Sequence, residues 1–309
     1  WKLDASATFD GSNWSIPDSS SNSNNGTMYG SVATLPAALQ RSDLSFTSGY
    51  SLYAMNFDGI DDYILPGFLN SFITNDVTVS IWVNYTTLPS GFDGSFIGSQ
   101  SYTSGLGMVA SAGQIRFFIE NYTSNYVENT VSLSTNRWYH FCGTWNGSTI
   151  ELFVDGVSQG TDDYSGSITT SNQLEIGRVF NNSYNIDGKL SNMAIWNTGL
   201  TPAEVREVYN EGLPSNLNTF SGTAPVSWWQ LGENSSYAGG WTFADEMPAG
   251  NNGVGNGLNE TSLTNGVGTT ANGTSTGMSV GALVGDAPYS TANAISSGMA
   301  ATAKGTNVP

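Results

Sequence analysis

The chain has 309 residues, of which 39% are hydrophobic, and its 8 basic and 25 acidic residues give a formal net charge of −17. So few Lys and Arg argue against nucleic acid as a partner, because proteins bind phosphate backbones with clusters of cations. One Cys and one His are too few for a disulfide or a structural zinc site. No apolar run approaches the roughly 18 residues of a membrane span, so we expect no membrane insertion.

The body of the chain, from about residue 50 to 197, has the pattern of short strands separated by turns. Hydrophobic and polar residues alternate from Val77 to Tyr85, which is the period of a half-buried strand. The same pattern predicts strands at 114–120, 137–145, 150–154 and 174–179. Asn146-Gly147 predicts a β-hairpin, and Asp-Gly pairs at 58–59, 155–156 and 187–188 predict further turns. This spacing indicates an all-β fold, a two-sheet antiparallel sandwich.

One short helix follows the strands. Thr201 is a typical N-cap residue, Pro202 suits the first helical position, and Glu204 completes a capping box. Apolar residues then recur at helical spacing, and Gly212 is the expected stop. We expect this helix to dock on the sandwich.

The composition changes after Pro214. From 251 to 309 the chain is mostly Gly, Asn, Thr, Ser and Ala, with few large apolar residues to build a core. We therefore expect a C-terminal extended arm that packs on the sandwich or on a neighbouring subunit and mediates assembly.

An internal repeat links the two ends of the chain. The motifs Trp1-x-Leu3, Trp14-x-x-x-Asp18 and 24–26 (Asn-Asn-Gly) recur as Trp229-x-Leu231, Trp241-x-x-x-Asp245 and 251–253. The Trp-to-Asp and Asp-to-Asn spacings are kept in both copies. We interpret the second copy as the opening strands of a second, truncated unit.

Several blocks occur in the order known from one family. They lie at 1–3, 18–27, 51–63, 79–83, 137–141, 152–156, 186–190, 195–197 and 200–205. In these blocks the sequence resembles the laminin-G-like branch of the concanavalin A-like jelly rolls. The resemblance implies a jelly-roll sandwich over 1–214. The internal repeat and the composition assign the truncated repeat start and the arm to 215–309. It leaves function open, because the fold serves lectins, adhesins, glycanases and structural modules.

The second start at Trp228-Trp229 and the acidic chain rich in Ser, Asn, Gly and Thr have a further resemblance. They are similar to laminin-G-like virion surface proteins of marine tailed phages. This resemblance implies a place on a virion surface.

The resemblance also implies a calcium site, because laminin-G and pentraxin relatives hold calcium with carboxylates on turns. The candidate ligands here are Asp58, Asp61, Asp62 and Asp187. The family follows the late turn with an acidic pair, whereas this chain has Ser191-Asn192. The alternative is that these Asp side chains cap turns through hydrogen bonds to the backbone.

Four tyrosines are candidates for binding glycans: Tyr102, Tyr122, Tyr126 and Tyr184. They lie in or near predicted loops among Asn and Ser side chains, which suit hydrogen bonds to sugar hydroxyls. The alternative is that these tyrosines cover the edges of the sandwich.

We find no catalytic constellation in the sequence. His140, the single imidazole, lies in the middle of a predicted strand, where packing explains it. The Glu-x-Asp-x-x-Glu run of glycanases on related jelly rolls is absent, and Glu151 and Asp155 flank Phe153 at a strand end. The sequence therefore predicts a protein that is not an enzyme.

Two functions remain. The first is a non-catalytic structural surface protein, a phage virion component of the capsid decoration, tail or fibre. It assembles through its C-terminal arm with copies of itself or with other structural proteins, and it also takes part in recognising the host surface. The alternative is a secreted or cell-surface adhesin that binds cell-surface glycans with calcium as cofactor. The expected location is the virion surface, or alternatively the extracellular space or cell surface.

Overall fold

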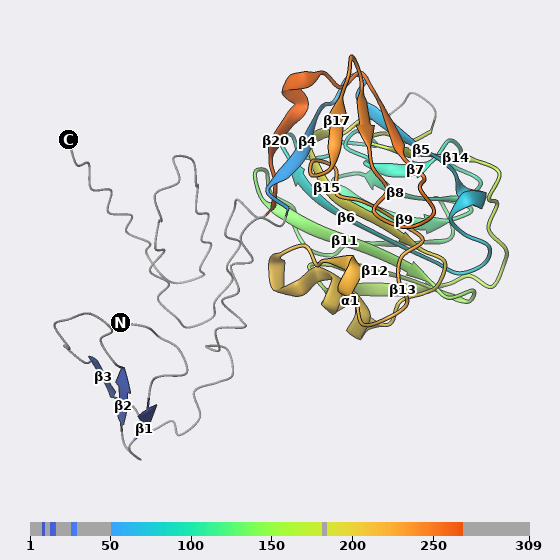
Figure 1. Ribbon diagram of the computed structural model, residues 1–309. Coiled ribbons are helices and arrows are strands. Elements are labelled where there is room, and N and C mark those ends of the chain that lie inside the picture. Colours follow the sequence, from blue (N-terminus) through green and yellow to red (C-terminus); the bar gives the residue numbers. More distant parts are fainter. Residues whose placement is uncertain (1–7, 10–12, 17–25, 30–50, 181–183, 268–309) are drawn as a thin grey trace. The chain divides into compact units, whose positions relative to one another are not determined.

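The predicted strands form two antiparallel sheets that enclose one apolar core (Figure 1). The computed structural model describes residues 8–9, 13–16, 26–29, 51–180 and 184–267, and the chain divides into two units, 1–49 and 50–309. In the first unit, β1 (Thr8–Phe9), β2 (Asn13–Ile16) and β3 (Gly26–Tyr29) form a three-stranded antiparallel sheet in that order. The sandwich belongs to the second unit.

The first sheet of the sandwich has eight strands. In spatial order they are β13 (Val157–Asp163), β12 (Thr149–Val154), β11 (Trp138–Trp145), β6 (Val77–Tyr85), β15 (Asp187–Trp196), β4 (Tyr53–Asp58) and β20 (Leu263–Asn265), while β16 (Ser227–Trp229) pairs with β15.

The second sheet has nine strands. Their order is β10 (Tyr126–Glu128), β9 (Gln114–Ile119), β8 (Leu106–Ser111), β7 (Ile97–Ser99), β14 (Gln173–Ile176), β5 (Tyr63–Phe68), β19 (Gly253–Asn256), β18 (Trp241–Phe243) and β17 (Ser235–Tyr237).

Alternate side chains of both sheets build the core between them. It contains Ile81, Phe141 and Ile195 from the eight-stranded sheet and Met108, Phe117 and Ile176 from the nine-stranded sheet. The predicted two-sheet antiparallel jelly-roll sandwich is confirmed.

Strand β6 is buried along its whole length, although its alternation predicted one exposed face. Later parts of the chain cover that face. The Thr78 hydroxyl donates to the carbonyl of Thr198 and accepts from the Leu200 N–H, and Trp82 stacks on Tyr209 with ring centroids 5.8 Å apart. Alternation shows which side chains share a face, but it does not show what a distant segment places over them.

Helix α1 (Pro202–Tyr209) begins where the sequence predicted. The Thr201 hydroxyl accepts from the Glu204 N–H, and the Glu204 carboxylate accepts from the Thr201 N–H at 2.7 Å, which is a complete capping box. The helix ends at Tyr209 rather than near Gly212, because Asn210 adopts a left-handed conformation with φ 46°.

The helix covers the outer face of the eight-stranded sheet, as expected. Its buried residues Val205 and Val208 belong to a second apolar cluster that includes Cys142 of β11 and Phe153 of β12. Among the described residues, no helix has the length and apolarity needed to cross a membrane.

The predicted hairpin at Asn146-Gly147 and the predicted turn at Asp155-Gly156 form, and the predicted turn at Asp187-Gly188 is wrong. Asn146-Gly147 connects β11 to β12, and Asp155-Gly156, with φ values of 51° and 73°, connects β12 to β13. Asp187-Gly188 instead begins β15, because Gly188 is paired on both sides, with Phe57 of β4 and Tyr85 of β6.

The described part of the C-terminal region, residues 215–267, contributes strands to both sheets. Strand β16 pairs with β15, β19 pairs with β5, and β20 pairs with β4. These residues therefore belong to the same unit as the sandwich. The chain divides at 49/50, whereas the sequence placed a boundary at 214/215. The reason is that Trp229 and Trp241 are buried in the core of the sandwich and complete it. The predicted arm beyond 267 lies outside the described residues.

Candidate functional site

A small apolar cluster lies on the outer face of the nine-stranded sheet. Successive strand residues point to opposite faces, so Phe117 of β9 enters the core while Phe118 points outward. Phe118 forms a buried cluster with Val109 and Val179, and aromatic side chains pack over it. Three of these covering side chains, together with two rings that pack on them, form what we call the aromatic cap. Its members are Tyr122, Phe180 and Tyr184, with Phe92 and Tyr102 as the ring partners.

Tyr122 is the centre of the aromatic cap. Its ring centroid lies 5.4 Å from that of Phe92 and 5.9 Å from those of Tyr102 and Phe180. Tyr184 closes the group, at 5.1 Å from Phe92 and 6.0 Å from Phe180. These rings meet edge-on or tilted, which are the favourable geometries for aromatic pairs.

Tyr126 borders the aromatic cap on β10. It packs on the same apolar cluster, and the Arg116 guanidinium lies 4.0 Å above its ring. Arg116 also forms an ion pair with Glu128 at 2.5 Å. This edge of the site therefore combines an aromatic face with paired charges.

All four tyrosines singled out in the sequence thus come together, although they lie on three separate segments. A backbone hydrogen bond from the Tyr122 N–H to the Tyr102 carbonyl, 3.2 Å long, joins two of these segments. Tyr102 is 56% exposed, while Tyr122, Tyr126 and Tyr184 are partly buried. These tyrosines cover the sheet, and Tyr102 also presents aromatic surface to solvent.

The backbone of the aromatic cap is strained at two positions. Phe180 has φ 59° and Tyr184 has φ 66°, in the left-handed region that large side chains rarely adopt. Such conformations persist where the surrounding structure enforces them, and they cluster at ligand-binding and active sites.

Sequence reasoning missed Phe92 and Phe180. The adjacent pair Phe117-Phe118 was the available signal, because two successive aromatic residues in a strand place one ring on each face. The outward ring needs a cover, and nearby aromatic residues are the natural source.

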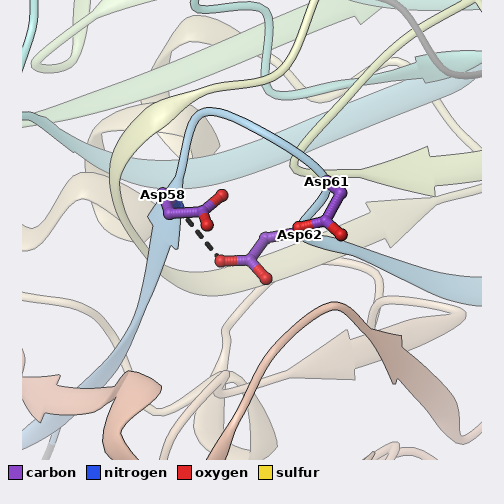
Figure 2. Close-up of side chains that lie close together, drawn as sticks. All are labelled: Asp58, Asp61 and Asp62. Carbon is purple, nitrogen blue, oxygen red and sulfur yellow. Dashed lines mark hydrogen bonds between the residues drawn. The ribbon is translucent and has the colours of Figure 1, made fainter.

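Three of the four predicted calcium ligands also come together (Figure 2). Asp58, Asp61 and Asp62 lie on the turn between β4 and β5, with carboxylate oxygens within 4.8 Å of one another. The turn-capping reading applies as well, because Asp62 accepts from the Asp58 N–H at 3.0 Å and Asp58 accepts from the Ile60 N–H at 2.8 Å.

The electrostatics of this turn suit a cation. Burial raises the pKa of Asp62 to about 6, and the negative charges of Asp58 and Asp61 add to the rise against the hydrogen bond from the Asp58 N–H. Asp58 and Asp61 are exposed, so their remaining oxygens face solvent. An oxygen-only set of carboxylates fits Ca²⁺, a hard cation with irregular coordination.

Asp187 does not join this group. It lies opposite Asp58 in the pairing of β15 with β4, but its carboxylate accepts a hydrogen bond from the Thr87 hydroxyl. Its carbonyl accepts from the Thr86 and Thr87 N–H groups. Asp187 therefore anchors the chain that leaves β6.

His140 is fully buried beneath α1. Its Nε2 lies 2.7 Å from the Ser80 hydroxyl, and its ring lies 5.2 Å from Trp82 and 5.8 Å from Tyr209. Burial lowers the pKa of His140 to about 3 and raises the pKa of the neighbouring Cys142 thiol far above its usual value. Neither group is therefore ionised at neutral pH.

Residues 57–206 match a family model, Laminin_G_3, described as the concanavalin A-like lectin/glucanases superfamily. No curated protein sequence matches the chain. The sandwich therefore has a concanavalin A-like fold, and the predicted resemblance to that fold is confirmed.

Three solved structures are similar to this chain, and one of them, with a TM-score above 0.5, agrees with the fold. A candidate carbohydrate binding protein from Bacteroides ovatus is similar with a TM-score of 0.54 and 16% identity, over 78% of this chain and 67% of that one. Domain 4 of an extracellular arabinanase from Geobacillus stearothermophilus, solved in complex with arabinotriose, gives 0.42 and 16%, over 50% and 76%. A heptameric SAP-like pentraxin from Limulus polyphemus gives 0.41 and 17%, over 52% and 82%.

Proposed function

We propose that the protein is a non-catalytic, glycan-binding surface protein and that the aromatic cap with Tyr126 binds the sugar. The observation that carries the proposal is the convergence of Tyr102, Tyr122, Tyr126 and Tyr184 from three segments onto one sheet face. The carbohydrate-binding description of the Bacteroides ovatus protein, which shares the fold, supports this reading.

The chemistry of the aromatic cap suits a sugar. A pyranose ring has an apolar face of C–H groups, which packs on an aromatic ring, and a rim of hydroxyls, which need hydrogen-bond partners. Tyr102 offers an exposed ring. The polar residues Ser101 and Thr103 flank it in sequence, and Asn121 precedes Tyr122, whose N–H donates to the Tyr102 carbonyl. The exposed ring binds the face of the sugar, and these neighbours bind its rim.

The test is a glycan array, followed by titration of the best ligand with the full chain. Tyr102→Ala should weaken binding about tenfold, since an aromatic contact contributes up to about 1.5 kcal/mol. Tyr53→Ala is the matched control, because Tyr53 is 45% exposed but lies in β4 of the other sheet. Equal affinity of both variants and the wild type, or an array without any saturable ligand, would contradict the proposal.

Calcium is the cofactor we propose for this protein, held by Asp58, Asp61 and Asp62. The proximity of the three carboxylates and their mutual repulsion support it. Calorimetric titration with calcium chloride at pH 7.5 should show one site that Asp62→Asn removes. Asp163→Asn, which changes an exposed carboxylate of β13 outside the group, should leave the site intact. Binding that survives Asp62→Asn would overturn the assignment.

A structural role on a virion surface is the second candidate function, and the repeat shared by both ends of the chain favours it. In this role the chain assembles with copies of itself or other surface proteins through the arm at 268–309. Removing 268–309 should leave the fold intact and abolish incorporation into particles, measured with purified particles. Unchanged incorporation would exclude the arm from assembly.

A further inference from the structure

The internal repeat has a structural counterpart. Trp14 and Trp241 are 227 residues apart, and the same offset carries β3 (Gly26–Tyr29) onto β19 (Gly253–Asn256). With the same offset, the residue numbers of β1 fall within β17, and those of β2 include all of β18. Both copies are three-stranded antiparallel meanders, in the orders β1-β2-β3 and β17-β18-β19.

The register of the last two strands is the same in both copies. Ile16 lies opposite Gly26 in the first copy, and Phe243 lies opposite Gly253 in the second. Ser15 likewise pairs with Thr27, as Thr242 pairs with Val254. The two segments therefore share the order of three strands and the register of the last two, which a chance match of a few residues does not explain.

The second copy completes the sandwich at one edge. Strand β19 adds to β5, and β16 adds to β15, so the segment extends both sheets. Its side chains Trp229, Leu231, Trp241 and Phe243 are buried in the main core. We call the surface of β5 and β15 that receives them the acceptor edge.

The residues that the two copies share are the ones this docking uses. The Asp245 carboxylate accepts from the Trp228 N–H and the Asn251 N–H, both at 3.0 Å, which fastens the meander to β16. The Asn251 carbonyl accepts from the Trp229 indole at 2.8 Å. The first copy has Asp18 and Asn24 at the matching positions.

Gly253 is the most specific of these residues. A Cβ placed on Gly253 would lie 2.8 Å from Cγ2 of Ile64 on β5, and 3.5 Å from the nearest atom of its own meander. The need for glycine thus comes from the acceptor edge rather than from the meander itself. Gly26 keeps the glycine in the first copy, at the position where β3 pairs with β2.

We propose that the acceptor edge binds residues 1–29 of a second copy of this chain in place of its own residues 227–256. Each chain has two segments, 1–29 and 227–256, that fit one acceptor edge. When residues 1–29 of one chain fill the edge of another, every edge stays filled, and the displaced residues 227–256 are free to bind a further chain. The contacts made between chains are those made within one, which makes exchange a low-cost route to assembly. Because donor and acceptor are different surfaces, the links are head-to-tail and continue into a chain of molecules.

Disulfide trapping in the full chain tests this proposal. Val254 lies opposite Leu65 in the pairing of β19 with β5, so Leu65→Cys with Val254→Cys should form an intrachain disulfide and serves as the positive control. Thr27 is the counterpart of Val254, so Leu65→Cys with Thr27→Cys should give disulfide-linked dimers and longer multimers on a non-reducing gel. The native Cys142 is fully buried and does not interfere.

Two glycine variants in the trapping background sharpen the result. Gly26→Val should abolish the multimers, whereas Gly253→Val should increase their share severalfold, because it weakens the chain's own segment. Gly240→Ala is the control, since a Cβ there meets nothing within 4 Å, and it should change neither result. A disulfide confined to single chains, or none while the control pair forms, would overturn the proposal.

Discussion

At the scale of single residues, burial decides what the titratable side chains of this protein do. His140 is 0% exposed and Asp62 is 5% exposed, yet the first packs against aromatic rings and the second lies beside two exposed carboxylates. Burial makes His140 a neutral packing residue, whereas the neighbours of Asp62 make it a candidate for binding a cation.

The first prediction concerns the pH dependence of stability. Burial lowers the pKa of His140 to about 3, against the ordinary 6.5 of the unfolded chain, so between these values only the unfolded state binds the extra proton. Stability is therefore retained above about pH 6.5 and falls as the pH drops toward 3, by up to about 1.4 kcal/mol per pH unit. Urea unfolding of the wild type and of His140→Gln between pH 4 and pH 8 should show a shallower slope in the variant. Parallel curves would contradict the prediction.

The two candidate sites differ in how far single residues could predict them. Asp58, Asp61 and Asp62 lie within one turn, so the sequence alone groups them. The four tyrosines could be named because they follow loop signals, but their convergence depends on which loops the sheet brings together. Only three-dimensional pairing supplies that information.

At the scale of elements, local signals were sufficient where the structure depends on neighbours in sequence. The capping box at Thr201 and the hairpin at Asn146-Gly147 form as predicted, because their hydrogen bonds join residues a few positions apart. The burial of both faces of β6 could not be predicted, because α1 and its flanks, more than 100 residues later, cover the outer face.

The second prediction concerns the start of α1. Thr201→Ala removes the side-chain acceptor of the capping box and should lower the free energy of unfolding by about 1 kcal/mol. Thr201→Ser keeps a hydroxyl and should lose only a small part of that stability. Urea denaturation of the three proteins gives the comparison, and equal losses in both variants would show that the cap is not the cause.

At the scale of the whole molecule, residues 227–256 are part of the sandwich rather than an appendage. Trp229, Leu231, Trp241 and Phe243 together contribute about 6–12 kcal/mol of burial, at about 1.5–3 kcal/mol each. A domain's net stability is about 5–15 kcal/mol. The compositional change after Pro214 hid this role, because it reflects the tail as a whole rather than the few aromatic residues that dock.

The third prediction follows from that role. A protein of residues 50–267 should unfold in one cooperative transition, whereas residues 50–214 should lack a cooperative transition and aggregate. Residues 1–214, which keep the first repeat, should fold only as linked chains. Circular dichroism on heating and mass measurement in solution distinguish the three. A monomeric, cooperatively folded 50–214 would show that the acceptor edge needs no partner.

Residues 227–256 are synthesised late, and this affects how the chain folds during synthesis. Strand β15 ends at Trp196, and the segment that closes it continues to Asn256, about 60 residues later. At a synthesis rate of about 5–20 residues per second, the growing chain exposes an unpaired, apolar edge for about 3–12 s. Ribosomes that follow one another on the same message hold several such nascent chains side by side, each with its first repeat already made, so exchange between chains can begin before synthesis ends.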